Sequence, residues 1–306
     1  MQLIGGQAVL NGVMMKSRNH MAIAVRKEDK SIAVHTERVH SLLERHSFLR
    51  WPFIRGAVVL VETMFLGYRS LNISAKLSLG EEEVGWKETA LTLVLAVAFT
   101  LAVFKLLPLL AAEYAARLFP AVQENYLLYN LVDGITKITL FVVYLAGISL
   151  LADVREVFRY HGSEHKAVNC HERSLALEVD NARDCPITHP RCGTTFVLVV
   201  LTLSVALYLF IPAGTPLLGK YLLRVALLPV VAGLSYEVIR IGARNWNLAA
   251  VRMLLAPGLA FQLLTTRAPR DDQLEVALAA LGAVLELEKV TEARTAQTAR
   301  PATAPG

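Results

Sequence analysis

Four long runs of apolar residues dominate the pattern of this chain. They cover residues 90–112, 127–151, 195–211 and 217–239, and each holds few charged side chains. A helix of about 20 apolar residues can cross a hydrocarbon core of about 30 Å. We therefore predict a mainly α-helical, polytopic membrane protein with about four transmembrane helices, which form a transmembrane domain over residues 90–240.

The segment before the first run is less apolar. Residues 48–66 combine a short apolar centre with Arg50, Trp51 and Arg55. Arginines and large aromatic rings suit the boundary between lipid and water. We predict that residues 48–89 form an interfacial or re-entrant helical segment, with a fifth span as the alternative.

The distribution of Lys and Arg predicts the orientation. Residues 1–90 carry twelve of them, residues 152–194 six and residues 240–306 eight, whereas 112–125 and 213–220 carry one each. Basic segments remain on the cytoplasmic side of a membrane. We therefore predict a multi-pass protein of a bacterial inner membrane, with both termini and the loop 152–194 in the cytoplasm.

The net charge of +5 fits the same picture. A basic chain first suggests nucleic-acid binding, but here the basic residues follow the topology and can attract anionic lipid head groups. The hydrophobic content of 54% also exceeds the roughly 45–50% of soluble domains. We expect membrane lipids as partners and no nucleic acid, with a cytoplasmic protein or a second copy of the chain as further candidates.

Polar segments precede and follow the apolar runs. Residues 21–26 and 31–36 flank a polar turn and predict a hairpin, within a small β-rich cytoplasmic element over residues 1–47. The glycine-rich stretch before this hairpin permits close backbone approach or positive φ, and we favour a packing turn there over a phosphate site.

The C-terminal part has a different character. Residues 271–289 begin with acidic and end with basic side chains and carry an apolar face, which predicts an amphipathic helix that packs on the domain or on a partner. We assign residues 241–290 to cytoplasmic interfacial and amphipathic helices. Residues 291–306 are poor in bulky apolar side chains and are predicted to be a disordered tail.

The candidate chemistry is concentrated in the loop 152–194. His161 and His165, with Glu164 between them, fit the pattern H-x-x-E-H. On a helix the two imidazoles lie one turn apart on one face and can hold a zinc ion, and the carboxylate can act as a base, as in the inverted zincins. We predict His161 and His165 as metal ligands and Glu164 as the catalytic residue. The alternative is that both histidines donate to backbone carbonyls.

A second group of metal donors precedes the third apolar run. His189 and Cys192 are three residues apart, and both residue types bind zinc and similar ions. A Pro-Gly loop that caps the following helix is the alternative. A carboxylate is expected as a further ligand, either Glu237 or the nearer Glu172, although Glu237 can instead pair with Arg240 or Arg244.

Several phrases occur together in a recognisable order. They are GGQAVLNGVMM, RWPFIRGAVVLVETMFLG, RYHGSEHKAVNCHE, THPRCGTTF and APGLAFQLLTTRAP. Over about residues 4–270 the chain resembles the YqhQ-like family of bacterial membrane proteins, known as domain of unknown function 1385. The resemblance implies a metal-dependent enzyme, a label that rests on the family's His, Glu and Cys pattern.

The family motifs fall on the candidate residues. The motif HGAEHK matches His161, Glu164 and His165, and the motif HPRCGT matches residues 189–194. One departure is Asn11, which stands where the family usually has a glutamate. Asparagine keeps the hydrogen-bonding shape without the charge, so a structural role for this position is favoured.

These observations predict a metal-dependent hydrolase with a cytoplasm-facing site that binds zinc or another divalent metal. The alternative is a non-enzymatic membrane scaffold or assembly factor, which displays its N-terminal β element and the helix 271–289 to cytoplasmic partners. A transporter is less favoured because the spans carry few charges and no paired broken helices. The sequence does not choose between a peptide and a lipid head group as substrate.

Overall fold

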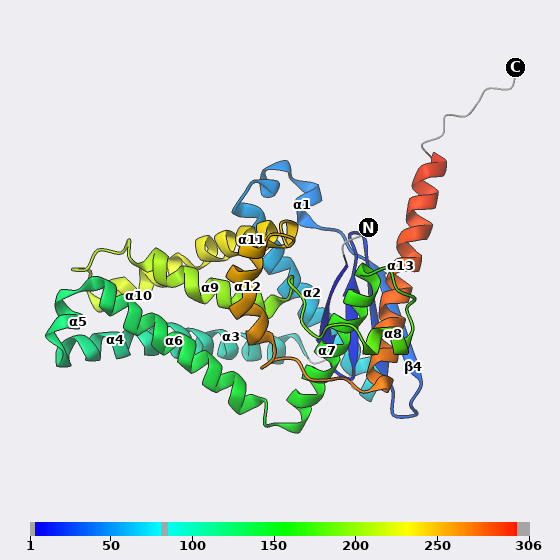
Figure 1. Ribbon diagram of the computed structural model, residues 1–306, viewed down its shortest axis with the longest axis horizontal. Helices are drawn as coiled ribbons and strands as arrows, with labels where there is room; N and C mark the ends of the chain where they lie inside the picture. The colour runs from blue at the N-terminus through cyan, green and yellow to red at the C-terminus, as the bar shows by residue number, and fades with distance from the viewer. Residues whose placement is uncertain (1–3, 81–84, 299–306) are drawn as a thin grey trace, which may run out of the picture.

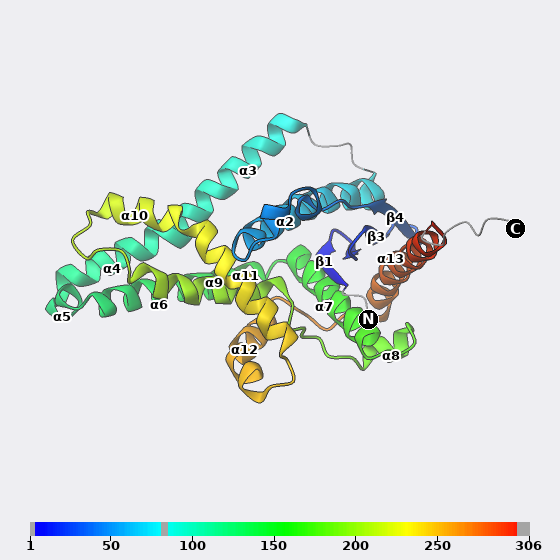
Figure 2. The same ribbon diagram turned by 90° about the horizontal axis from the view of Figure 1, so that it is seen from above.

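A computed structural model describes residues 4–80 and 85–298, apart from the side chains of Trp86 and of residues 294–298. The protein consists of a sheet packed between helices, called here the sheet body (residues 4–80, 152–183 and 271–298), and a long helical arm (residues 86–148 and 193–239) (Figures 1 and 2). In chain order the elements are β1 (Gly5–Val9), β2 (Gly12–Lys16), β3 (His20–Arg26), β4 (Ile32–Arg38), α1 (Leu42–Arg45), η1 (Ser47–Arg50), α2 (Ile54–Leu79), α3 (Trp86–Leu101), the π-helix η2 (Ala102–Leu106), α4 (Leu107–Leu118), α5 (Pro120–Glu124), α6 (Tyr126–Ile148), α7 (Ala152–Glu172), α8 (Val179–Arg183), α9 (Gly193–Tyr208), α10 (Leu217–Ala226), α11 (Leu228–Arg244), α12 (Ala249–Gln262) and α13 (Asp271–Thr298).

The sheet is antiparallel and has the strand order β1-β2-β3-β4. The predicted hairpin is confirmed as β3–β4, in which Ile23 lies opposite His35. The glycine-rich stretch before it forms a second hairpin, β1–β2, instead of a packing turn alone. Asn11 lies in the turn of this hairpin with φ 51°, a conformation that Asn tolerates better than most residues, so a structural role fits this position.

Helices cover both faces of the sheet. Side chains alternate between the two faces of a strand, and the face that carries Val13 and Ala24 packs against α7 and α13. The opposite face, which carries Met14 and Ile23, packs against Leu66 and other residues of α2. The helix α7 is thereby fixed over β1, where it presents its histidines to the strand.

The predicted amphipathic helix is present as α13. Its apolar face is buried in the sheet body through Leu274, Ala277 and Leu281, so this part of the helix is a core element. The helix also continues to Thr298, whereas the sequence predicted a disordered tail from residue 291, because Ala, Glu and Arg in this stretch favour helix. Residues 299–306 lie outside the described residues.

In the described residues, two helical segments of the arm are long and apolar enough to cross a membrane. They are Lys87–Leu118 and Tyr126–Ile148, and they correspond to the first two predicted spans. The fourth predicted span is bent by 45° between α10 and α11, where Pro229 lies in the first turn of α11. The third is α9, whose 16 residues measure about 24 Å, less than the hydrocarbon core. The structure therefore has two candidate spans, or three if the bent pair is one span, and not clearly four.

The segment predicted to be interfacial or re-entrant contains one long helix, α2. Its second half packs on the sheet, and its first half approaches α11 so closely that a Cβ on Gly56 would lie 2.9 Å from the Cα of Gly233. Trp51 and Phe53, just before α2, are 65% and 52% exposed. The helix therefore connects the sheet body with the arm.

Candidate metal centre

The helix α7 presents two histidines to one point. The ring centroids of His161 and His165 lie 4.4 Å apart. Nδ1 of His161 lies 2.9 Å from the carbonyl oxygen of Thr265, and Nδ1 of His165 lies 2.6 Å from that of Ile187. A carbonyl only accepts, so each Nδ1 carries the proton and each Nε2 keeps a lone pair for another partner.

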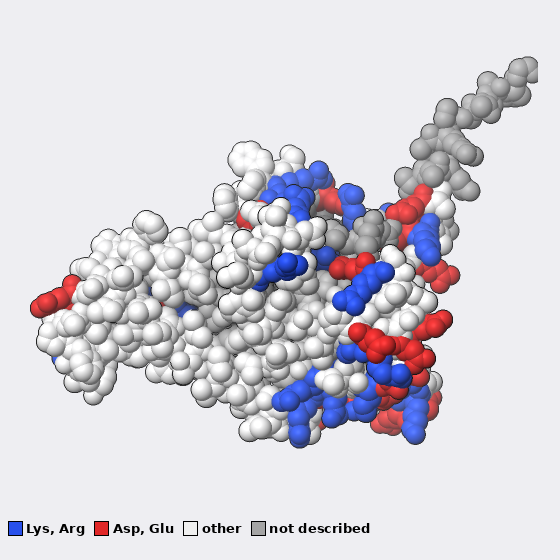
Figure 3. Space-filling view, viewed as in Figure 1, with Lys and Arg blue, Asp and Glu red and all other residues white. Residues whose placement is uncertain are grey.

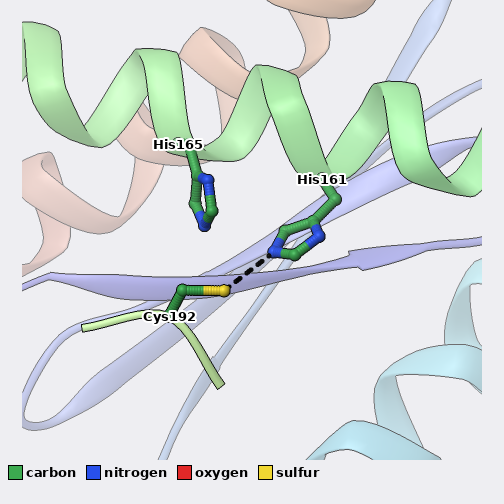
Figure 4. Close-up of side chains that lie close together, drawn as sticks. All are labelled: His161, His165 and Cys192. Carbon is green, nitrogen blue, oxygen red and sulfur yellow. Dashed lines mark hydrogen bonds between the residues drawn. The ribbon is translucent and has the colours of Figure 1, made fainter. Parts of the chain in front are cut away.

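The third donor comes from the start of α9. Cys192 is the N-cap residue of this helix, and its Sγ lies 3.3 Å from Nε2 of His161. One ligand atom from each of His161, His165 and Cys192 lies within 4.8 Å of the others, and Figure 4 shows the three side chains pointing toward one another. A zinc ion holds such donors at about 2.0–2.3 Å, so small side-chain movements would close the set around one ion.

Glu164 lies beside this group and is buried. Its Oε2 is 3.5 Å from Nε2 of His165, and it accepts a hydrogen bond from the backbone N–H of Gly6. A Cβ on Gly6 would lie 2.7 Å from Cγ of Glu164, so only glycine allows this approach of β1 and α7. Burial raises the pKa of Glu164, although the neighbouring cationic groups oppose the shift. A carboxylate in such a place is stabilised by a cation.

His189 belongs to an adjacent ion-paired group. Its Nε2 lies 3.3 Å from Oε2 of Glu172, and its Nδ1 accepts a hydrogen bond from the backbone N–H of Arg191. The Arg191 guanidinium also donates to Glu172 and to the carbonyl of Ile4. Burial alone would raise the pKa of Glu172, but the hydrogen bonds from His189 and Arg191 outweigh it and lower that pKa to about 2. Both ring nitrogens of His189 are thus engaged outside the His161–His165–Cys192 group.

These side chains line one cavity of about 90 Å³. Its size suits an ion, a few waters and one small group, since a single water needs about 10–15 Å³ by this measure. The residues that line it are Ile4, Gly5, Gly6, His161, Glu164, His165, Val168, His189, Arg191, Cys192 and Gly193. The predicted residues of both motifs therefore line this cavity together: His161, Glu164, His165, His189 and Cys192.

Glu237 is not brought to this cavity. Its two oxygens accept hydrogen bonds from Nε of Arg55 at 2.7 Å and from the second guanidinium nitrogen at 2.5 Å, and Arg240 lies 4.0 Å away. The backbone of Phe53 also bonds to it. Glu237 therefore fixes the start of α2 against α11, because it faces that helix and not α7.

Sequence reasoning missed two residues that hold the cavity. Gln262, at the end of α12, is fully buried and bonds both the N–H and the carbonyl of His189. Thr265 supplies the carbonyl that orients His161. The sequence marks only Gln262: it is a single glutamine inside the apolar stretch LLAPGLAFQLL, and a buried amide needs hydrogen-bond partners.

The fold and the site define a mainly helical protein with a small antiparallel sheet and a His/His/Cys group. The chain belongs to the family described as "Protein of unknown function (DUF1385)", whose sequence profile matches residues 51–287. It is 32% identical over 304 residues to "Uncharacterized protein YqhQ" of Bacillus subtilis (strain 168), and the match covers 94% of each chain. No solved structure gives a significant match.

Proposed function

We propose that this chain is a multi-pass membrane protein that holds a divalent metal ion between His161, His165 and Cys192 and acts as a metal-dependent hydrolase. The observation that carries the proposal is the convergence of two Nε2 atoms and one Sγ atom, with each histidine oriented by a carbonyl behind it. Nitrogen and sulfur donors suit zinc, and three protein donors are typical of catalytic zinc sites.

The neighbouring residues have defined roles in this proposal. When bound, the ion supplies Lewis-acid chemistry to a hydrolytic reaction. Glu164 accepts and holds a proton at Oε2, and the burial that raises its pKa strengthens it as a base. The N–H of Gly6 fixes the orientation of this carboxylate. The substrate is a peptide or a lipid head group.

Membrane insertion is supported by the surface of the protein. In the face shown in Figure 3, charged side chains gather over the sheet body, whereas the arm is almost uncharged up to its tip. The arm also holds both segments that are long and apolar enough to span. We infer that the arm lies in the bacterial inner membrane, in contact with lipids, and that the sheet body, with the cavity and both ends of the chain, faces the cytoplasm. Reporter fusions at residue 175 and within 213–216 test this orientation.

Metal content of the detergent-purified protein tests the central claim. After loading with zinc and dialysis, the wild type should retain one ion per chain by mass spectrometry, and the His161→Ala/His165→Ala variant should retain none. A matched control is the His35→Ala/His40→Ala variant, which removes two histidines of the β4 region and should retain the ion. Equal metal content in the wild type and the His161→Ala/His165→Ala variant rejects the proposal.

Replacement of zinc by cobalt tests which side chains are ligands. The cobalt-loaded protein should show a sulfur-to-cobalt absorption band that the Cys192→Ser variant lacks. The Glu164→Gln variant should bind metal like the wild type, since Glu164 is proposed as the base and not as a ligand. If the band persists in Cys192→Ser, Cys192 is not a ligand.

A further inference from the structure

The arm contains a second group of charged residues, apart from the metal centre. Among the described residues, every Lys or Arg side chain that is buried belongs to it. The group surrounds Tyr208, the last residue of α9, which is fully buried. We call it the arm cluster, and its members are Lys105, Asn130, Asp133, Lys137, Ser204, Tyr208, Lys220 and Arg224.

One carboxylate of the arm cluster is fully paired. Oδ1 of Asp133 accepts from Arg224 at 2.6 Å, and Oδ2 accepts from Lys137 at 3.1 Å. All three side chains are about 1% exposed. Arg224 also donates to the amide oxygen of Asn130, and Lys137 to the hydroxyl of Ser204. Asp133 can balance only one of its two cations.

The other two lysines have no carboxylate of their own among the described residues. Lys105 donates to the hydroxyl of Tyr208 at 3.0 Å, and Lys220 lies 4.5 Å from the ring centre of Tyr129. A further acid, Glu113, accepts from the hydroxyl of Tyr129, the ring next to Lys220. Four cations therefore face two carboxylates, and two positive charges are in excess in an apolar arm, where uncompensated charge is costly.

Hydrogen-bond donors are in excess as well. Nε of Arg224 is buried and has no acceptor among the described residues, and Lys105 has one acceptor for three N–H groups. Three cations lie around the ring of Tyr208: Arg224 at 4.7 Å, Lys137 at 4.8 Å and Lys105 at 5.5 Å from its centre. A neutral lysine would reduce the charge but would leave Nε of Arg224 without an acceptor. A bound anion would balance the excess positive charge and would accept hydrogen bonds from the unsatisfied N–H groups.

The backbone is irregular at the same two cations. Lys105 lies in the π-helix η2, and Arg224 lies just before the 45° bend between α10 and α11. Single π-helical turns and broken helices recur at functional sites, and broken helices in membranes line ion sites. Both irregularities therefore lie at cations that contact Tyr208.

We propose that the arm cluster binds a small monovalent inorganic anion, such as chloride, beside Tyr208 and between Lys105 and Arg224. The site offers the N–H donors of Lys105 and Arg224 and excess positive charge, which suit a spherical anion without directional demands. The Tyr208 hydroxyl donates to the carbonyl of Arg224 and accepts from Lys105, so its role is to position Lys105. The proposal is independent of the metal centre, because the two groups share no residue.

Binding of radiolabelled chloride to the full-length protein in detergent tests this inference. The wild type should bind about one ion per chain, and chloride should raise Tm over gluconate at equal ionic strength, saturably and by roughly 2–4 °C. Lys105→Met should abolish both effects, and the milder Tyr208→Phe should weaken chloride binding at least several-fold. Lys87→Met removes an exposed cation from the same span and should behave like the wild type.

Two results would overturn the inference. One is a wild-type protein that binds no chloride and has the same Tm in chloride and gluconate. The other is chloride binding that persists unchanged in both Lys105→Met and Tyr208→Phe, which would place the ion elsewhere. If Lys105→Met fails to fold, Tyr208→Phe still decides, because it removes one hydroxyl and no charge.

Discussion

Replacement of Gln262 by leucine tests how the cavity is held together. The amide oxygen accepts from the N–H of His189 at 2.9 Å, and the amide nitrogen donates to the His189 carbonyl and to the hydroxyl of Thr195, both at 2.7 Å. Leucine has a similar size but no polar atoms, so it leaves these buried groups without partners. Each unsatisfied group costs about 1–3 kcal/mol, and we expect a loss of about 3–5 kcal/mol in unfolding free energy.

The same change should weaken metal binding. Gln262 holds the backbone of His189, which is three residues before Cys192, so its loss loosens the segment that delivers the thiol. Changes in residues that orient ligands typically weaken metal binding 10–100-fold. We expect a loss of that size for Gln262→Leu, measured by competition with a chromophoric chelator.

Gln273→Leu is the matched control. Gln273 is also fully buried; it accepts from the N–H of Arg270 at 3.0 Å and donates to Glu156 at 2.8 Å, but it lies on α13 and does not line the cavity. It should lower Tm to a similar degree and leave zinc affinity unchanged. The reasoning is refuted if Gln262→Leu binds zinc as tightly as the wild type, or if Gln273→Leu weakens binding equally.

Three further outcomes are expected. Gly6→Ala should lower Tm by the equivalent of about 1–3 kcal/mol, because its Cβ would overlap Glu164, whereas Gly5→Ala, with open space around it, should be neutral in the same melting assay. The pKa of Glu172 is lowered to about 2, so the stability that its ionised form contributes is present above about pH 4.5 and is lost as the pH falls toward 2. Glu172→Gln should remove this contribution, about 1–2 kcal/mol of unfolding free energy after solvent screening, and should flatten the dependence of Tm on pH in that window. Leu281→Ala in the core of α13 should lower the unfolding free energy by about 2–5 kcal/mol in denaturant titrations.

The sequence predicted correctly those features that depend only on residues close together in the chain. The spacing of His161 and His165 places them on one helical face, and that holds whatever α7 packs against. The β3–β4 hairpin and the first two apolar helices follow from period and length in the same way. The third and fourth apolar runs could not be judged by composition alone. The third forms a helix of only 16 residues, and the fourth is bent by 45°.

Tertiary contacts determined the rest of the site. Glu237 and Glu164 are both acidic residues near histidines or apolar runs in the sequence, yet only Glu164 faces the cavity, because Arg55 binds Glu237 from α2. The glycine stretch was ambiguous for a related reason. Gly6 lacks a side chain because Glu164 occupies that space, and Glu164 is 158 residues away, so no local pattern reveals the constraint.

The position of the donors joins the two halves of the protein. Cys192 is the first capping residue of α9, which belongs to the arm, whereas His161 and His165 lie on α7, which packs on the sheet. Thr265, which orients His161, follows α12, which packs on α9 of the arm. Any change in how the arm lies against the sheet body therefore alters the distance from Sγ to the imidazoles, and an ion bound between them would resist that change. The proposed metal binding and the packing of the arm would thus be thermodynamically linked: each would stabilise the other by the same free energy.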